Sequence, residues 1–245
     1  MSDKIIGRNS VSEAVKSGRE IDKIIVKKGE IEGSLRSIIK KAKIAGIPVI
    51  EADKHKLDAL AEGGNHQGVV AFCATHEYTS VEDILKTAQE KDRPPFLIIL
   101  DKITDPHNFG SILRTANCAG ADGVIIPKRG SVGLNETVAK TSAGAVEYLP
   151  VAKVTNIAQA IEKLKKEGLW IVGAEAGGSV MYDTDLTGAI ALVIGSEGEG
   201  ISHLVKEKCD FLCEIPMYGN VNSLNASVAA AVMMYEVVRR RYSKN

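Results

Sequence analysis

Apolar residues in the first 75 positions alternate between strand-like and helix-like spacing. Residues 31–45 place four apolar side chains on one helical face, and Gly46 stops that pattern. A shorter helix is predicted at 10–16, and another follows Asp53, which can cap it, as far as Leu60. Strands are predicted at 21–28, 48–51 and 69–74. These elements predict a small α/β domain over residues 1–75, which is about the minimum size for a domain.

A connecting segment follows this domain. Ser80 and Asp83 have the spacing of a helix-capping box, although Asp takes the usual Glu or Gln position. Apolar residues between Val81 and Ala88 then fall on one helical face, and Pro94-Pro95 ends the segment. We therefore predict a linker at 76–93 and a larger second domain at 94–245.

From Phe96 onward, continuous apolar strands alternate with helices. The predicted strands are 96–100, 123–126, a short one near 149, 169–173, 189–194 and 211–215. The predicted helices are 110–119, 135–143, 156–166 and 202–208, and a last helix closes the chain. Apolar strands between helices are typical of a parallel sheet covered on both faces, so the fold class is α/β. Ligands bind such sheets at the carboxyl ends of strands, which selects the loops after Leu100, Gly173, Ile194 and Ile215.

The last helix is apolar in nearly every direction between Ala226 and Val237, so we expect it to be buried. Ser223 is a candidate N-cap, and unpaired backbone donors would lie beside Ser223, Asn225 and Ser227. Taken alone, this stretch favours an ordinary buried helix with a polar cap.

Composition excludes several classes of protein. The 31 basic and 31 acidic residues cancel, so a nucleic-acid partner would need a local patch. Aromatic residues make up only 4% of the chain, which argues against a base-stacking platform. One candidate for a basic face is a set of N-terminal lysines, although a solvated surface explains them equally well. That set is Lys23, Lys27, Lys28, Lys40, Lys41 and Lys43.

The four cysteines show neither zinc-ligand spacing nor a disulfide framework, so we expect no metal site. We interpret them as buried thiols in a reducing compartment. No signal-peptide pattern begins the chain, and no apolar run reaches membrane-spanning length. These features predict a cytoplasmic protein without a membrane partner.

Three of the selected loops carry unusual residues. The first runs from Asp105 to Ala116 and includes Asn108 near a helix start and Arg114 in an apolar helix, where an arginine needs a pair or a site. The second, Gly195 to Gly200, has the order G-x-x-G-x-G and two acids, which disfavours a dinucleotide phosphate. The third runs from Pro216 to Ser227. Three such loops at strand ends indicate a ligand site, and a cationic or neutral nucleoside fits it best.

These three stretches resemble the motifs of the SpoU, or TrmH-like, RNA ribose 2′-O-methyltransferases of the SPOUT superfamily. The matching segments are Asn108 to Ala116, Leu192 to Gly200 and Ile215 to Ser227, in the family's order. The N-terminal 75 residues resemble the family's small substrate-binding domain, which is related to a ribosomal-protein fold. The turn from Asn65 to Val69 and the run from Asp105 to Asn108 look most like the RlmB-type subgroup, which methylates a guanosine of 23S rRNA.

The resemblance implies a deep trefoil knot in the C-terminal domain, although the periodicity alone predicts an unknotted doubly wound sheet. It implies that S-adenosylmethionine (SAM) is the cofactor, without a metal. It also implies a homodimer formed through the catalytic domains, with large-subunit ribosomal RNA as the other partner. The implied cofactor-binding residues are Ala174, Gly195, Gly198, Ile215, Met217, Leu224 and Ser227.

By position, the resemblance gives catalytic roles to Arg114, Asn108, Glu197, Ser223 and Asn225. The implied reaction is attack of a ribose 2′-oxygen on the sulfonium methyl carbon. Using Arg114 as the base near pH 7 would cost about 7 kcal/mol, because a guanidinium titrates above ~12. A general base gains only about 3–5 kcal/mol. We therefore hypothesise that Arg114 orients the ribose and stabilises developing oxyanion charge, and that Glu197 fixes Arg114 or Asn108.

Other functions stay open at this point. Within the family, the alternatives are 2′-O-methylation of tRNA or of another rRNA site, including a resistance-type site. Outside it, the alternatives are a non-catalytic RNA-binding or ribosome-assembly protein and a small-molecule nucleotide enzyme. Intact Asn108, Arg114, Glu197 and Asn225 argue against the former, and the glycine order of the second loop disfavours the latter.

Overall fold

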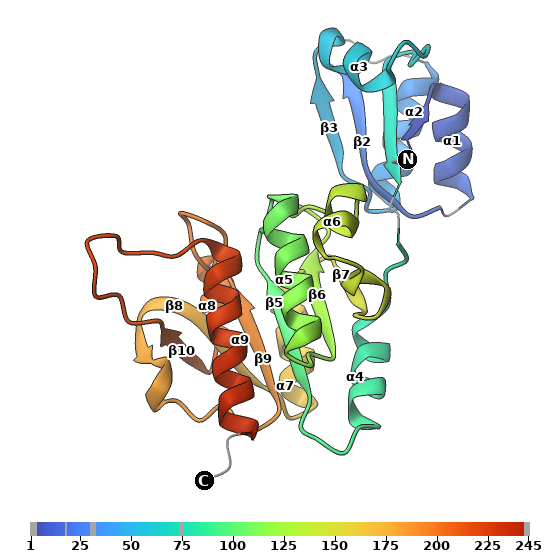
Figure 1. The fold of residues 1–245 in the computed structure, drawn as a ribbon. Helices are drawn as coiled ribbons and strands as arrows, with labels where there is room; N and C mark the ends of the chain where they lie inside the picture. Colours follow the sequence, from blue (N-terminus) through green and yellow to red (C-terminus); the bar gives the residue numbers. More distant parts are fainter. Residues whose placement is uncertain (1–3, 18, 30–32, 74–75, 243–245) are drawn as a thin grey trace. The chain divides into compact units, whose positions relative to one another are not determined.

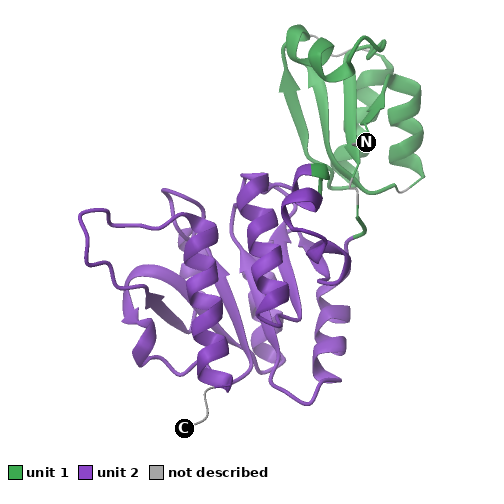
Figure 2. Cartoon of the chain, in the orientation of Figure 1, with its two compact units in different colours: residues 1–77, 133–136 green, residues 78–132, 137–245 purple. Residues whose placement is uncertain are grey.

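The chain folds into two compact units (Figure 2). A computed structural model describes residues 4–17, 19–29, 33–73 and 76–242. One unit comprises residues 1–77 with 133–136, and the other comprises 78–132 with 137–245. The predicted helix start at 31 and strand end at 74 lie outside the described residues.

The first unit is a four-stranded sheet with helices on both faces. Its strand order is β1 (Lys4–Ile6), β4 (Val69–Cys73), β2 (Ile21–Lys27) and β3 (Val49–Ala52). Strand β2 runs parallel to β3 and antiparallel to β4. The helices are α1 (Arg8–Lys16), α2 (Ser34–Ile44) and α3 (Lys54–Ala61). The predicted small α/β unit is confirmed, except that the three-residue strand β1 was too short to give a periodic signal.

Alternation along β2 explains the two layers of helices. Ile24 and Val26 pack in one cluster with α1 and α2, whereas Ile25 packs in another with Leu57 of α3. Successive side chains of a strand point to opposite faces, so both faces of β2 are buried. Helix α3 begins where predicted, because the Asp53 carboxylate accepts a hydrogen bond from the backbone N–H of Lys56 at 2.8 Å.

The second unit contains a six-stranded, fully parallel sheet (Figure 1). The strands, in spatial order, are β10 (Phe211–Glu214), β8 (Trp170–Val180), β9 (Ile190–Ile194), β5 (Phe96–Leu100), β6 (Gly123–Pro127) and β7 (Val151–Val154). Every neighbouring pair is parallel. The predicted parallel α/β sheet is confirmed, and the trefoil knot stays a prediction.

Helices cover both faces of this sheet. They are α4 (Val81–Gln89), α5 (Pro106–Cys118), α6 (Glu136–Thr141), α7 (Ile157–Lys166), α8 (His203–Lys206) and α9 (Ala226–Tyr242), with 3₁₀ turns at Ala145–Glu147 and Met181–Asp183. Side chains of α4, α7 and α8 share one core with Leu97 and Ile99 of β5. Helices α5 and α9 contact each other, and Figure 1 shows them side by side along the sheet.

Residues 76–93, predicted as a linker, include helix α4. The Ser80 hydroxyl accepts a hydrogen bond from the backbone N–H of Asp83 at 3.0 Å, as the capping box predicted. Val81, Ile84 and Leu85 are buried in the core of the second unit. Helix α4 is therefore a structural part of that unit.

One strand differs from its prediction in a way that shapes the site. We expected a strand at 169–173, but β8 continues to Val180. Leu212 of β10 pairs with Gly173, whereas the next residue, Cys213, pairs with Ser179. Residues 174–178 therefore bulge out of the pairing with β10, although Ala174 still pairs with Ile194 of β9.

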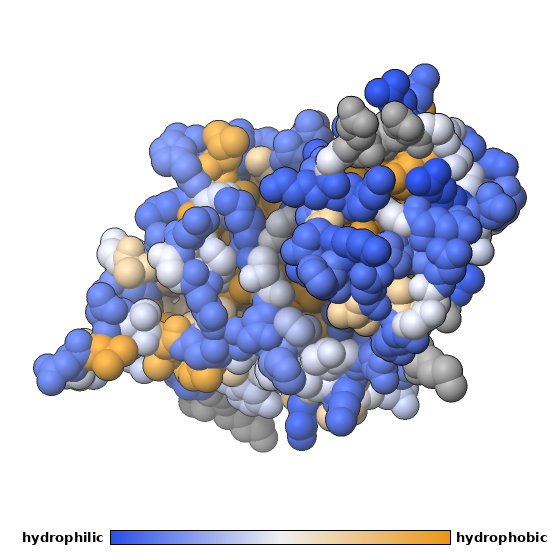
Figure 3. Space-filling model, turned by 90° about the horizontal axis from the view of Figure 1, so that it is seen from above, coloured by the Kyte–Doolittle hydropathy of each residue, from blue (hydrophilic) through white to orange (hydrophobic). Residues whose placement is uncertain are grey.

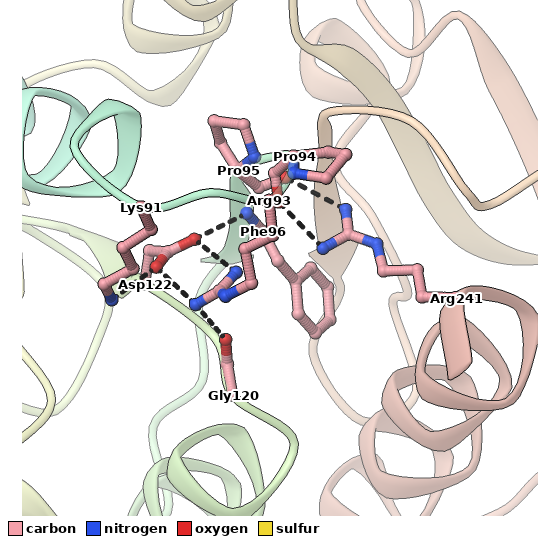
Figure 4. Close-up of polar contacts among 8 residues, drawn as sticks. All are labelled: Lys91, Arg93, Pro94, Pro95, Phe96, Gly120, Asp122 and Arg241. Carbon is pink, nitrogen blue, oxygen red and sulfur yellow. Dashed lines mark hydrogen bonds and ion pairs between the residues drawn. The ribbon is translucent and has the colours of Figure 1, made fainter.

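A buried carboxylate organises the opposite, amino-terminal end of the sheet (Figure 4). The Asp122 side chain is 1% exposed and accepts hydrogen bonds from Lys91 Nζ at 2.7 Å and from the backbone N–H of Phe96 at 2.8 Å. Arg93 adds two more contacts through its guanidinium, at 2.7 and 3.1 Å. The charge and hydrogen-bonding capacity of Asp122 are therefore satisfied, as a buried carboxylate requires.

The last turn of α9 is tied to the same end of the sheet. The Arg241 guanidinium donates to the backbone carbonyls of Pro94 and Pro95, each at 3.0 Å (Figure 4). It also donates to the carbonyl of Gly188. It lies over the ring of Phe96, 5.2 Å from the centroid. Burial lowers the pKa of Arg241. The contacts fix α9 at one end, while its other end forms part of the site.

Candidate functional site

A cleft of about 930 Å³ lies at the carboxyl ends of β8, β9 and β10. Its lining comes from residues 174–176, 194–200, 213–215 and 222–226, with Met217 and Ala229. These segments follow the strands whose ends the sequence analysis selected, with the exception of β5. The cleft volume falls in the range of about 300–1,000 Å³ that is usual for small-molecule sites.

Most of the residues expected to bind a cofactor line this cleft. They are Ala174, Gly195, Gly198, Ile215, Met217 and Leu224. Ser227 does not line it, and instead donates its backbone N–H and its hydroxyl to Asn225 Oδ1 at 2.9 and 2.7 Å. Among the residues expected to be catalytic, Glu197, Ser223 and Asn225 line the cleft. The roles of all these residues stay predictions.

Glycines determine the shape of residues 195–200, which form one wall of the cleft. Ser196 and Gly200 exchange two backbone hydrogen bonds of 3.0 Å, which closes a tight turn. A Cβ at Gly195 would lie 2.1 Å from the carbonyl carbon of Gly200, so no larger residue fits there. Gly200 has a φ of 67°, which other residues rarely adopt. The turn therefore needs glycine for geometric reasons and presents its backbone to the cleft.

A shared carboxylate oxygen joins the three unusual loops. Glu197 Oε1 accepts hydrogen bonds from Asn108 Nδ2 at 2.6 Å and from Asn225 Nδ2 at 2.7 Å. Asn108 lies in the first turn of α5 and is buried, with 7% of its surface exposed. We call Asn108, Glu197 and Asn225 the amide–carboxylate network. It fixes the start of α5 and the start of α9 against the glycine turn.

The start of α9 corrects one prediction. The helix begins at Ala226, and Asn225 Oδ1 accepts from the backbone N–H groups of Ser227 at 2.9 Å and Val228 at 3.4 Å. Asn225 is therefore the N-cap, and the predicted cap Ser223 is wrong. A capping side chain must directly precede the first helical residue, and Ser223 lies two residues too early. Ser223 is exposed and lines the cleft.

The expectation that α9 is buried all round is also wrong in part. Ala230, Met233 and Val237 are fully buried, but Val228 and Tyr235 are 46% and 50% exposed. The helix lies on the outer layer of the unit, so one face stays uncovered. The composition of the helix misled the prediction because apolar side chains also occupy that exposed face.

Arg114 stands apart from the cleft. It is exposed, and its side chain makes no hydrogen bond or ion pair with any other residue that the structure describes. It follows Asn108 by six residues in α5, which corresponds to about 240° of rotation and about 9 Å along the helix axis. The structure therefore does not bring Arg114 together with Glu197, and the expectation that Glu197 fixes Arg114 is not met within one chain.

Carboxylates dominate the charge of the cleft. Glu175, Glu197, Glu199 and Glu214 all line it. Lys206 Nζ lies 3.0 Å from Glu175, and the backbone N–H of Gly177 donates to Glu214 at 2.8 Å. Glu197 accepts from two amides, and the largely exposed Glu199 lies 3.8 Å from Lys102 Nζ, so the cleft favours a ligand that carries positive charge rather than a phosphate.

Sequence reasoning missed two of these carboxylates. Glu175 lies in the bulge of β8, where it also accepts from the backbone N–H of Ile201 at 3.2 Å. Glu214 is the last residue of β10. Both residues lie at the ends of apolar strand segments in the sequence. Ligands bind at the carboxyl ends of parallel strands, so this position could have identified them as candidate site residues.

The cysteines only partly fit the expectation of buried thiols. Cys73 and Cys213 are buried, but Cys118 is exposed and Cys209 is intermediate. Burial raises the pKa of the Cys209 thiol to about 12. Within the described ranges, no group of three metal-ligating side chains comes together, and none of the helices is long and apolar enough to cross a membrane.

Comparisons with known proteins agree with this site and fold. Residues 95–235 match the model of the SpoU rRNA Methylase family, and residues 4–79 match the model for RNA 2′-O ribose methyltransferase substrate binding. The chain is 49% identical over 240 residues to the putative TrmH family tRNA/rRNA methyltransferase YacO of Bacillus subtilis, covering 98% of this chain and 96% of the relative. A relative of the same description from Staphylococcus aureus is 50% identical over 97% of this chain and 96% of its own length.

Solved structures show the same fold. The SpoU methyltransferase AviRb of Streptomyces viridochromogenes, in complex with the cofactor AdoMet, matches with a TM-score of 0.62 at 24% identity, over 97% of this chain and 90% of that chain. An AdoMet-bound rRNA methyltransferase from Sinorhizobium meliloti gives the same TM-score and identity over 98% of this chain and 88% of that chain. With both units matched and close relatives aligned along nearly the whole chain, the protein belongs to the SpoU, or TrmH, family of RNA methyltransferases.

Proposed function

We propose that the protein transfers a methyl group from SAM to a ribose 2′-hydroxyl of RNA, with a guanosine of 23S rRNA as the target. The amide–carboxylate network carries this proposal, because it joins all three family motifs at one cleft. The family descriptions name rRNA and 2′-O ribose substrates, whereas the relatives are named for tRNA or rRNA. Methylation of tRNA is therefore the second candidate.

The cleft fits SAM in size and charge. SAM supplies an activated methyl group on a positively charged sulfonium, and four carboxylates line the cleft. Ala174, Ile215 and Leu224 provide apolar surface for the adenosine, and the turn at Gly195 provides backbone donors and acceptors. No metal is needed for this arrangement to bind a cation.

In this proposal, Asn108, Glu197 and Asn225 position the site, and Ser223 contacts the ribose from the rim of the cleft. Glu197 Oε1 already accepts two hydrogen bonds, so we assign it to holding the amides in place rather than to removing a proton. Arg114 orients the ribose and its phosphate through its fork of donors.

Because Arg114 is exposed and lies outside the cleft, we propose that it acts in a homodimer. The uncovered face of α9 carries Val228, Tyr235 and Tyr242 at seven-residue spacing, 46%, 50% and 63% exposed. Such an apolar stripe suits a second copy of the chain. In this dimer, Arg114 of one protomer completes the cleft of its partner.

Mixing two inactive variants tests this arrangement. Arg114→Ala and Glu197→Ala should each abolish most of the activity. A mixed dimer would still contain one cleft with an intact Glu197 and an intact Arg114 from the partner, so mixing should restore activity. A mixture as inactive as its components would contradict action across the dimer.

We propose that residues 1–75 bind the RNA substrate. Helix α2 carries Arg36, Lys40 and Lys43 on one face and has no acidic residue. All three are exposed, and none has an ion-pair partner among the described residues. Spaced by about 6 and 4.5 Å along the helix, they suit successive backbone phosphates. Figure 3 shows one face of the molecule, which is largely hydrophilic with hydrophobic residues in small groups.

Tritiated SAM and separate batches of unmodified 23S, 16S and transfer RNA test the substrate. Label in 23S rRNA that is lost in Arg114→Ala would support the proposal. Label in tRNA would retain the chemistry and replace the substrate. No label in any RNA would count against free RNA as the substrate.

A further inference from the structure

Lys102 occupies a backbone conformation that suits glycine. Its φ is 63°, in the left-handed region, and only three other non-glycine residues in the described part of the chain have a positive φ. Lys102 directly follows Asp101 at the carboxyl end of β5. A glycine would adopt this conformation without strain. A lysine at this position is strained, so we ask what its side chain does there.

Both neighbours hold the backbone of Lys102 in place. The Asp101 N–H donates to the carbonyl of Ile194 at 2.9 Å, and the Asp101 carboxylate accepts from the N–H of Ser202 at 2.8 Å. On the other side, the carbonyl of Ile103 accepts from the N–H of Val132 at 2.9 Å. Asp101 and Ile103 are buried, so the side chain of Lys102 is turned outward.

This side chain lies at the rim of the cleft. Lys102 Nζ is 3.8 Å from Glu199 Oε2, which is too long for a hydrogen bond, and the two side chains are 49% and 80% exposed. Glu199 lines the cleft. An exposed pair at this distance is weak, so Lys102 has capacity for a stronger anionic partner.

A second loop adds positive charge beside it. A Cβ at Gly130 would lie 3.7 Å from Lys102 Cγ, so the turn after β6 lies beside Lys102. That turn carries Lys128 and Arg129, and Arg129 is exposed. In the ranges that the structure covers, the side chains of Lys128 and Arg129 have no ion-pair partner. We call Lys102, Lys128 and Arg129 the rim cations.

We infer that Lys102 and Arg129 bind an RNA backbone phosphate beside the ribose that enters the cleft. The inference rests on the proposed function and adds a positioning site for its substrate. The cleft itself is acidic, whereas Glu199 is the one carboxylate within ion-pair distance of the rim cations among the described residues, so an anion is favoured at the rim and a cation inside. Phosphate contacts of this kind set the position and orientation of a nucleic acid.

Lys102→Gly tests the inference, because it removes the charge and the backbone strain together. It should raise Tm by about 2–4 °C. It should weaken RNA binding about three- to tenfold and reduce the slope of log Kd against log salt by about 0.7–0.9. The Kd for SAM should not change. Lys102→Arg, which retains the charge, should bind RNA within about twofold of the wild type.

Ala143→Gly is the matched control. Ala143 also has a positive φ, of 50°, lies in the same unit and carries no charge. It should raise Tm similarly and leave RNA binding unchanged. An unchanged RNA Kd in Lys102→Gly would overturn the inference, and so would a weaker Kd for SAM, which would place the cofactor's carboxylate at Lys102. If the wild type binds SAM but neither binds nor methylates RNA, the proposed function fails with it.

Discussion

Glu197 offers the sharpest test of how the site is held together. Glu197→Ala removes the acceptor for Asn108 Nδ2 and for Asn225 Nδ2, at 2.6 and 2.7 Å. The Asn108 amide is buried, so leaving it without a partner costs about 1–3 kcal/mol. The exposed Asn225 bond adds about 1 kcal/mol. The total of about 2–4 kcal/mol corresponds to a fall in kcat/KM of about 30- to 1,000-fold if the network sets the reactive geometry.

Glu197→Gln separates positioning from proton removal. The glutamine oxygen can still accept from both amides, and only the charge is lost. We therefore expect kcat/KM to fall by about ten- to thirtyfold, clearly less than in Glu197→Ala, since each charge-assisted bond weakens by about 1 kcal/mol. The assay is initial-rate transfer of labelled methyl from SAM to RNA, with circular dichroism to confirm folding.

Two results would refute this reasoning. If Gln and Ala were equally damaging, Glu197 would act through its ionisable oxygen, as a general base does. If Glu197→Ala retained activity within about threefold of the wild type, the network would have no part in the reaction.

Three other predictions concern the rest of the second unit. Arg241→Met should lower the free energy of unfolding in urea by about 2–4 kcal/mol, because the carbonyls of Pro94 and Gly188 lose this donor and that of Pro95 retains only the N–H of Ile190, with the Kd for SAM unchanged. The hydrogen bond from Arg239 lowers the pKa of Glu236, although burial acts to raise it. The ionised Glu236 carboxylate therefore stabilises the fold near neutral pH, and this stabilisation is lost as acid protonates the carboxylate. Glu236→Gln should therefore flatten the loss of stability below about pH 4. A thiol reagent at pH 8 should modify exposed Cys118 quickly and spare Cys209, whose pKa is raised to about 12, so Cys118→Ser should remove the fast phase.

Local signals predicted the elements of the fold well. The strand at 96–100 was placed to the residue because its apolar run is continuous and bounded by Pro95. The caps at Asp53 and Ser80 were found because a capping side chain acts within three residues. The carboxyl-end rule selected four loops, and three of them line one cleft.

Non-local contacts account for what the sequence could not show. The bulge after Gly173 depends on pairing with Leu212, almost 40 residues later, and it is this bulge that places Glu175 in the cleft. Asn225 rather than Ser223 caps α9 because the chain turns into the helix only at Ala226. The case of Arg114 is different, because the apolar residues of α5 (Phe109, Ile112, Leu113 and Ala116) share one face and leave Arg114 on another. The resemblance, and not the spacing, placed Arg114 in the site.

Mass spectrometry of nucleosides tests the central claim most directly. The purified protein would be incubated with SAM and unmodified 23S rRNA, and the RNA then digested to nucleosides and fragmented. The account predicts a guanosine that carries one methyl group on its ribose. This methylated guanosine should be absent when the Glu197→Ala variant replaces the wild type. A methyl group on a base would contradict it. So would RNA in which no ribose is methylated, if the protein binds both that RNA and SAM.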